Sequence, residues 1–525
     1  MGQPCDYLIV GGGAAGCVVA RVLAERGYRV TIVEAGRTQT PPLRRPADYL
    51  RSFGTRDDWA FVTVPQPELA GRRIRQPRGR GPGGSTRINA MIWYPPQATD
   101  LRMLAEAGGP DWAPDRLDAS LNRVTAWVRP EPPRWLSTAS RRFLDLSRPA
   151  FHAPHPFARM TDRRGRKTAA DLLMDSGSVV WVDGQAERLL FAEASSGEDA
   201  VAPRDPLRVT GVEVRQPDNP QPRTILADRG VVLCGGAIGS PTLLLRSGIG
   251  PADVLNPCGI VPRVVSEEVG HHLVDHLVMP VIFGIPPRER FPTRFSVRDL
   301  ARWQVVATGP ASSNLAEAGA IYALPPRGDA RQDRCRPPAG DDAEQARNQF
   351  QVHLTPTHYL LHPADGAPAA MTIGVNLCRP RSRGRLTLRS ADPRIPPDID
   401  PRYLTDEADG AGLVAAVGAA RELARSEPFA GWVREELLPG AKRPSFERTL
   451  QAIRRFSQTL YHPVGTCRMA RDGTGVVDAA CRVRGTVGLH VIDASVLPDI
   501  PSVNPNATVM ALAYHAATRM ASGSE

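Results

Sequence analysis

Three apolar runs separated by glycines and polar residues open the chain. Residues 6–10 read Asp-Tyr-Leu-Ile-Val, residues 11–16 read Gly-Gly-Gly-Ala-Ala-Gly before a longer apolar stretch, and residues 31–34 read Thr-Ile-Val-Glu. A short continuous apolar run is typical of a buried strand, and a longer one of a helix. The pattern therefore predicts a strand, a tight turn, a helix and a second strand that ends in a carboxylate.

This unit has the spacing of a dinucleotide-binding motif. Gly11 lets the strand turn sharply, Gly13 lets the backbone approach a pyrophosphate, and Gly16 lets the helix pack close to the sheet. The helix N-terminus then faces the phosphate charge, and Glu34 can take the ribose hydroxyls. A position at the start of the chain suits FAD-type flavoproteins, although these residues alone leave NAD open.

Two later runs also predict buried strands. Residues 229–241 lead through a strand into a Gly-rich turn and a helix, and residues 488–495 form a short apolar run that contains Asp493. The Pro/Asn-rich residues 501–506 then lead into a last helix.

The length and composition indicate a globular protein of more than one domain. A chain of 525 residues exceeds the usual single-domain size, and 42% hydrophobic with 23% charged residues is ordinary for a globular fold. No apolar run is long enough to span a membrane. Residues 1–5 lack a basic region and an apolar signal core, so we expect a cytoplasmic location.

Charge and cysteine usage exclude other classes. The net charge of +10 comes from dispersed basic residues, mostly Arg, without a basic run interleaved with aromatics, so we expect no nucleic-acid partner. The eight cysteines are scattered singly, which predicts reduced structural thiols and no metal site. His271, His272 and His276 lack a carboxylate-rich cluster, and we expect them to be surface or flavin-domain polar residues.

Two polar segments could carry chemistry. Residues 78–93 contain Gly83, Gly84, Ser85 and Asn89, whose backbone amides and side chains could reach an anion or a flat ring; the alternative is an ordinary Gly-rich loop. In the last segment, His462 taken alone would more often be a structural histidine. Asn504 and Asn506 would more often be turn residues or helix caps.

With these blocks in order, the chain resembles the glucose-methanol-choline (GMC) family of FAD-dependent oxidoreductases. The resemblance rests on residues 11–34, residues 83–89, residues 236–251 and the C-terminal block from Tyr461, and it extends over nearly the whole chain. It implies an α/β fold: a Rossmann-like FAD-binding domain with an interleaved α+β substrate domain that contains an antiparallel sheet. We expect the first in residues 5–275, completed by 463–520, and the second in 276–462.

The resemblance also implies the site. It places His462 and Asn506 in front of the flavin, His462 as the base that takes the hydroxyl proton while hydride passes to flavin N5, and Asn506 as a hydrogen-bond donor to the developing alkoxide. The implied cofactor-binding residues are Gly11, Gly13, Gly16, Glu34, Gly84, Ser85, Asn89, Ala186, Asp493, Ala494 and Asn504. Ile88 stands beside Asn89, where some members carry a histidine linked to FAD, so we predict non-covalent FAD.

The implied reaction is oxidation of a small-molecule alcohol to a carbonyl. Oxygen, a quinone or a dedicated carrier such as mycofactocin remain open as electron acceptor. The same scaffold hosts lyases and a light-driven decarboxylase, and a catalytically silent flavin-binding partner is a further alternative. Residues 124–170 look short for the family, which predicts a more open site or one completed by a partner. Residues 325–342 are expected to form a mobile surface loop.

Overall fold

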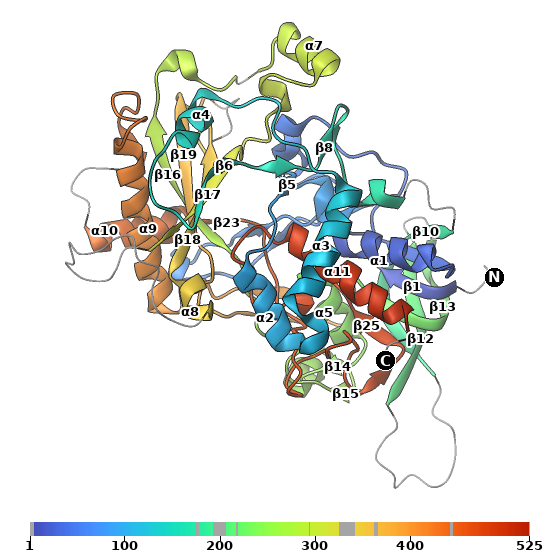
Figure 1. Ribbon diagram of the computed structural model, residues 1–525. Helices are drawn as coiled ribbons and strands as arrows, with labels where there is room; N and C mark the ends of the chain where they lie inside the picture. The colour runs from blue at the N-terminus through green and yellow to red at the C-terminus, as the bar shows by residue number, and fades with distance from the viewer. Residues whose placement is uncertain are drawn as a thin grey trace, which may run out of the picture.

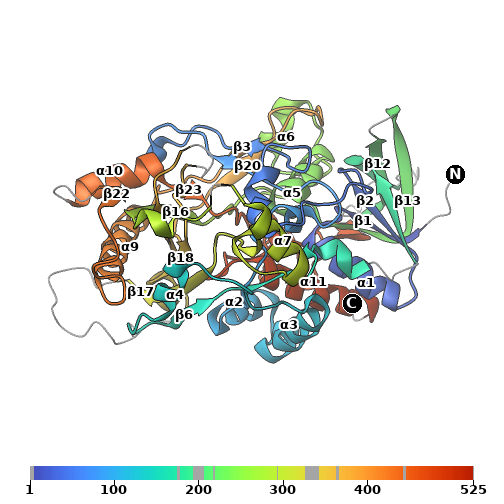
Figure 2. The same cartoon turned by 90° about the horizontal axis from the view of Figure 1, so that it is seen from above.

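The computed structural model describes residues 5–173, 178–192, 206–216, 219–292, 294–324, 342–361, 366–440 and 445–523. The loop expected at 325–342 lies outside this part except for residue 342. Two sheets, each with its own buried core, organise the chain (Figure 1). Figure 2 shows them side by side, with α9 and α10 at one end and β12 and β13 at the other.

The first sheet has eight strands in the order β10-β2-β1-β13-β12-β11, with β25 beside β13 and β24 beside β12. Their bounds are β1 Cys5–Val10, β2 Val30–Glu34, β10 Val179–Asp183, β11 Gln185–Phe191, β12 Leu207–Gln216, β13 Asn219–Leu233, β24 Thr486–Val487 and β25 Leu489–Val491. The central pairs β2-β1, β1-β13 and β13-β25 are parallel. All five residues of β2 are buried, as expected for a parallel strand covered on both faces.

Helix α1 packs against β1 and β2 of this sheet, as the predicted motif requires. The helices of the chain are α1 Ala14–Glu25, α2 Ala98–Gly108, α3 Pro114–Val128, α4 Thr138–Leu144, α5 Gly236–Arg246, α6 Ala252–Leu255, α7 Val297–Val306, α8 Asp342–Arg347, α9 Glu407–Arg425, α10 Phe446–Phe456 and α11 Asn506–Ala521. The strand, helix and second strand expected at the start are β1, α1 and β2. α11, from the end of the chain, packs on α1 (Figure 1).

The second sheet is antiparallel and has seven strands in the order β22-β16-β19-β18-β17-β6, with β23 beside β16. Their bounds are β6 His152–Pro156, β16 Leu277–Gly284, β17 Ala318–Ala323, β18 Gln349–Thr355, β19 Ala370–Leu377, β22 Glu436–Leu438 and β23 Gln458–Thr459. Helix α9 packs on one face of it. The architecture confirms the predicted α/β fold with a Rossmann-like unit and an antiparallel sheet.

Strand β18 shows how this sheet positions side chains. Phe350, Val352 and Leu354 belong to the core shared with α9, whereas His353 and Thr355 line a cavity on the other face. Alternate side chains of β18 therefore point to opposite faces of the sheet, so one set packs in the core and the other lines the cavity.

Short two-stranded sheets join the units: β3 Phe61–Val62 with β4 Arg75–Gln76, β5 Ile92–Trp93 with β7 Ala158–Arg159, β8 Thr161–Asp162 with β9 Gly165–Arg166, β14 Ile249–Gly250 with β15 Val264–Val265, and β20 Arg385–Thr387 with β21 Asp398–Asp400. The predicted boundary at 275/276 falls just before β16. Inside the predicted first range, however, β6 pairs with β17 and α4 packs in the second core, so the two units exchange more chain than expected. In the described part of the chain, no helix is long and apolar enough to cross a membrane.

Candidate active site

One cavity of ≈ 1060 Å³ is lined by residues of both units. All but one of the residues implied for the site line it: Gly11, Gly13, Glu34, Gly84, Ser85, Asn89, Ala186, His462, Asp493, Ala494, Asn504 and Asn506. Gly16 is the exception and does not line the cavity. Its role is in packing, since a Cβ there would stand 2.0 Å from the carbonyl oxygen of Gly11. It acts behind the cavity, where α1 meets β1. We call the end near Ala186 the nucleotide end and the end near His462 the histidine end.

Glycines shape the nucleotide end. Gly11 has a φ of +102°, and a Cβ there would stand 2.6 Å from the carbonyl oxygen of Cys234. Gly84, with a φ of +50°, brings the second Gly-rich loop against the first, because a Cβ on it would stand 2.7 Å from the Cα of Gly13. The start of α1 lies on the same wall, and the first amides of a helix have no partner within it. These features fit a pyrophosphate placed at the helix N-terminus.

Glu34 is tied into this wall. Its Oε2 accepts from the Gly12 amide at 2.9 Å, and its Oε1 accepts from the amides of Gly36 at 2.9 Å and Gly81 at 2.8 Å. A carboxylate offers about four acceptor positions. The Glu34 carboxylate thus joins three backbone segments and retains room for about one ribose hydroxyl.

Asn89 and Asp493 are likewise held by neighbours. Asn89 Oδ1 accepts from the Met91 amide and from Arg166, so its amide nitrogen is the group left for a ligand. Asp493 accepts from the Gly236 amide at 2.8 Å and from Ser240 and Ser495. This buried carboxylate joins the start of α5 to the last strand.

Three buried histidines form the histidine end. His462 Nδ1 lies 2.9 Å from His276 Nδ1, and His276 Nε2 lies 2.9 Å from the carbonyl oxygen of Cys378. His353 lines the cavity beside them, is 6% exposed, and its Nε2 has no partner among the residues described. Of the two positions expected for His276, the surface position is wrong, because His276 is 1% exposed and contacts His462 directly.

The hydrogen bonds define the tautomers. A carbonyl only accepts, so His276 Nε2 carries a proton, and burial lowers the pKa of His276, which keeps it neutral. Its Nδ1 therefore accepts from Nδ1–H of His462. Nε2 of His462 then carries the lone pair, which accepts a hydrogen bond from Nδ2 of Asn504 at 3.2 Å.

Electrostatics keep His462 uncharged. Burial lowers its pKa well below the ordinary value, and the nearby His276, His353 and Arg78 lower it further. Burial also lowers the pKa of His353, to about 3. A neutral His462 with its lone pair at the cavity wall can accept a proton.

The backbone around His462 is fixed by Asp275, which the sequence patterns did not single out. Asp275 Oδ1 accepts from the His462 amide at 2.8 Å, and Oδ2 accepts from Thr459, Tyr403 and Gln76. Tyr461, next to His462, has a φ of +68°. A bulky residue in this region is uncommon and often lies at a functional site.

The two asparagines differ in their contacts. Asn504 bonds to His462 and accepts from Gln351 Nε2 at 3.3 Å. Asn506, the first residue of α11, lines the same cavity, but its amide nitrogen lies 3.1 Å from the sulfur of Met160. The structure therefore joins His462 to Asn504 directly. The placement of His462 and Asn506 together in front of the flavin, which the resemblance implies, stays a prediction.

Comparison with known proteins identifies relatives over the whole chain. Two family models described as GMC oxidoreductase match residues 5–141 with 145–278, and residues 380–513. An alcohol dehydrogenase [acceptor] of Pseudomonas putida is 30% identical over 98% of this chain and 95% of its own length. An oxygen-dependent choline dehydrogenase of Yersinia pseudotuberculosis is 31% identical over 98% of this chain and 93% of its own. The crystal structure of pyridoxine 4-oxidase from Mesorbium loti superposes with a TM-score of 0.81 at 26% identity, covering 98% of this chain and 99% of that one.

Proposed function

The chain belongs to the GMC oxidoreductase family, and from that premise we propose that it oxidises an alcohol to a carbonyl with non-covalent FAD, using His462 as the base. The observation that carries the proposal is the lone pair on Nε2 of His462, which faces the same cavity as the glycine-built nucleotide end. A proton acceptor and a dinucleotide cradle in one cavity are what the reaction needs.

The residues present fit FAD. Gly13 and Gly84 let the two Gly-rich loops meet beside the start of α1, and one cavity runs from there to His462. When bound, FAD supplies the acceptor for the hydride that leaves the alcohol carbon. Ile88 lines the cavity and offers no nucleophile, which supports non-covalent binding.

His462 performs the proton step. Its Nε2 accepts the proton of the substrate hydroxyl, and His276 holds the ring in the required tautomer through Nδ1. The amides of Asn504 and Asn506 reach the same wall and can donate to the oxygen as it gains negative charge. We assign Asn504 the contact nearest His462 and Asn506 the second donor.

The charge of the cavity supports a neutral substrate. Among the residues described, only two carboxylates line it, Glu34 and Asp493, and both already accept several hydrogen bonds. The cavity is lined by six arginines: Arg73, Arg78, Arg80, Arg246, Arg389 and Arg394. At the histidine end a quaternary ammonium would gain no ion pair and would meet the charge of Arg78, which donates to the carbonyl oxygen of Tyr461. We therefore propose that this chain does not share the choline substrate named for its Yersinia relative.

Aromatic side chains support an apolar substrate. Tyr49, Phe53 and Tyr461 form a chain of ring contacts on the cavity wall beside His462, with centroids 6.2 Å and 5.3 Å apart. Trp59, Phe61 and Tyr359 line the same cavity. Aromatic rings bury large apolar areas and stack on flat ligands. An aromatic or other apolar alcohol fits this lining.

Anaerobic mixing in the dark tests the proposal. Neutral aromatic alcohols are expected to bleach the flavin absorbance at least about tenfold faster than choline at equal concentration, since one lost or repelled charge costs on the order of 1.4 kcal/mol or more. Faster bleaching by choline would contradict the assigned substrate class. Admission of air then separates an oxidase from a dehydrogenase that needs another acceptor. A cytoplasmic location remains a prediction, consistent with the free cysteines of the described part.

A further inference from the structure

A proline-rich segment covers the nucleotide end of the cavity. Residues 390–397, here called the strap, read Ser-Ala-Asp-Pro-Arg-Ile-Pro-Pro and follow β20, one of the short strands that join the units. Pro393, Arg394, Pro396 and Pro397 line the cavity together with Ala186. The strap therefore closes the end where the adenosine half of a dinucleotide is expected.

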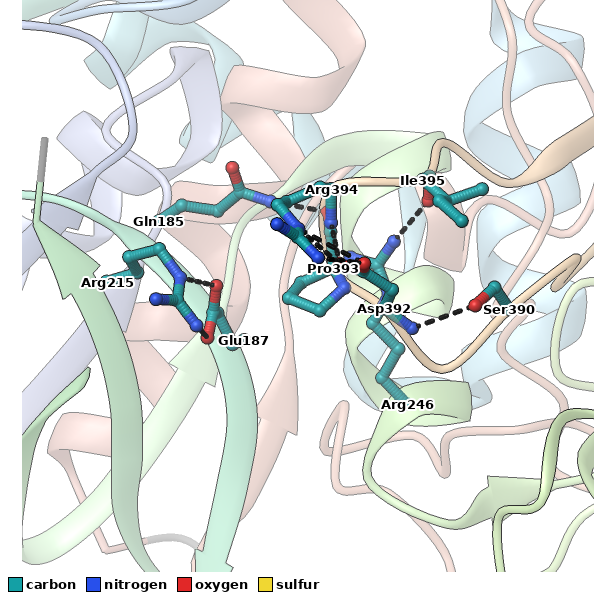
Figure 3. Close-up of polar contacts among 9 residues, drawn as sticks. All are labelled: Gln185, Glu187, Arg215, Arg246, Ser390, Asp392, Pro393, Arg394 and Ile395. Atoms are coloured by element: carbon teal, nitrogen blue, oxygen red, sulfur yellow. Dashed lines mark hydrogen bonds and ion pairs between the residues drawn. The ribbon is translucent and has the colours of Figure 1, made fainter. Parts of the chain in front are cut away.

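Two side chains of the first unit fasten the strap, as Figure 3 shows. Gln185 Nε2 donates to the carbonyl oxygen of Pro393 at 3.3 Å, and Arg246 Nη2 donates to that of Ile395 at 2.8 Å. Gln185 begins β11 and Arg246 ends α5, so both fasteners come from elements that also line the cavity.

Arg246 is a buried arginine whose guanidinium is only partly hydrogen-bonded. It is 7% exposed, and its Nε has no hydrogen-bond partner among the described residues. Two carboxylates act electrostatically on Arg246, and both are engaged elsewhere: Glu187 pairs with Arg215 at 2.6 Å, and Asp392 pairs with Arg394 at 2.6 Å (Figure 3). Burying a guanidinium without a full set of partners is costly, so a ligand group that completes the set would be bound favourably.

We propose that Arg246 and Gln185 hold the strap over the adenosine half of FAD and that the unpartnered Nε–H of Arg246 donates to it. Adenine ring nitrogens and ribose oxygens are acceptors within the chemistry of such a donor. This inference rests on the FAD binding of the proposed function, but it is independent of alcohol oxidation.

The release of FAD from the holoenzyme tests the proposal. Arg246→Met keeps the volume of the side chain and removes its donors, and Gln185→Leu does the same at the second fastener. FAD release on dilution is followed by the rise in free-flavin fluorescence. We expect Arg246→Met to release FAD about 10- to 100-fold faster, since a lost hydrogen bond to a charged group is worth this much, and Gln185→Leu about 2- to 10-fold faster, because its bond joins two neutral groups. The control is Arg482→Met, which breaks an ion pair with Asp478 away from the cavity and the strap and should leave the rate within about twofold.

Binding of ADP to the apoprotein separates a direct contact from a general loosening. Arg246→Met should lower ADP affinity about tenfold or more while leaving FMN affinity and the melting temperature of the apoprotein close to those of the parent. Unchanged FAD release in Arg246→Met, or an equal loss of ADP and FMN affinity, would overturn the proposal. Neither readout involves an alcohol, so failure here is distinct from failure of the proposed oxidation.

Discussion

The two ends of the cavity are built from different chemical groups. At the nucleotide end, glycines and backbone amides form the wall, and Glu34 braces three of those amides. At the histidine end, side chains carry the function: His353 and His462 line the cavity, His276 bonds to His462 from behind, and Asp275 accepts from the His462 amide. The first end recognises a ligand by shape and backbone polarity, and the second sets a protonation state.

This difference predicts the effect of a substitution at each end. A change at the nucleotide end should remove the cofactor, whereas a change at the histidine end should leave the cofactor bound and slow the chemistry.

Gly84→Ala should have the largest effect, because the added Cβ would stand 2.7 Å from Gly13 Cα and would separate the two loops. We expect the protein to be purified with little or no FAD, measured as the flavin-to-protein absorbance ratio. The control is Gly27→Ala, a glycine with a φ of +84° and no atom within 4 Å of its would-be Cβ. It carries a comparable backbone cost of about 1–2 kcal/mol and should retain FAD. Retention of FAD by Gly84→Ala would contradict the claim that the contact between the two Gly-rich loops is needed to bind the cofactor.

His462→Ala should keep FAD and slow its reduction by an alcohol about 10²- to 10⁴-fold, the usual contribution of a general base. Stopped-flow absorbance in the absence of oxygen measures the rate, and the flavin-to-protein ratio serves as the control. A reduction rate equal to that of the parent would remove His462 from the mechanism.

His276→Phe should have a smaller effect, since His276 acts only through His462. Loss of its Nδ1 acceptor frees the His462 ring to adopt the other tautomer, and we expect flavin reduction about 10- to 100-fold slower, as for other residues that orient a functional histidine. His276→Asn, which can still accept a hydrogen bond, should restore part of the rate and the parent's pH profile. If both variants lose the same activity with an unchanged pH profile, the role of His276 is packing alone.

The smallest expected effect is that of pH. Burial, His276, His353 and Arg78 all lower the pKa of His462, so it stays neutral and able to accept a proton until the pH falls below that lowered value. Flavin reduction should therefore change less than about twofold between pH 8 and pH 6, whereas an ordinary histidine would lose half its activity near pH 6.5. A midpoint at or above pH 6.5 would contradict the electrostatics described for this end.

The same contrast explains what could be predicted from the sequence. The β1-α1-β2 unit and the placement of Gly11, Gly13 and Gly16 follow from local patterns, because a tight turn and a close backbone approach require glycine at fixed spacing. The helix and strand periods of residues 5–34 were enough to predict this unit.

The histidine end could not be predicted in the same way. His276 and His462 are 186 residues apart and meet only when β16 and β23 pair. His353 did leave a signal, since residues 349–355 alternate polar and apolar positions in a strand with a covered polar face. Whether Asn504 or Asn506 contacts His462 depends on the entry angle of α11, which spacing alone does not give.

The central claim is tested most directly by a single turnover in the dark without oxygen. The purified yellow protein is mixed with an excess of a neutral aromatic alcohol, and the bleached flavin and the carbonyl product are both quantified. The account predicts complete bleaching with about one carbonyl formed per flavin. An unchanged flavin spectrum with every alcohol tested would contradict it and favour a lyase, a light-driven decarboxylase or a silent flavin-binding protein on the same scaffold.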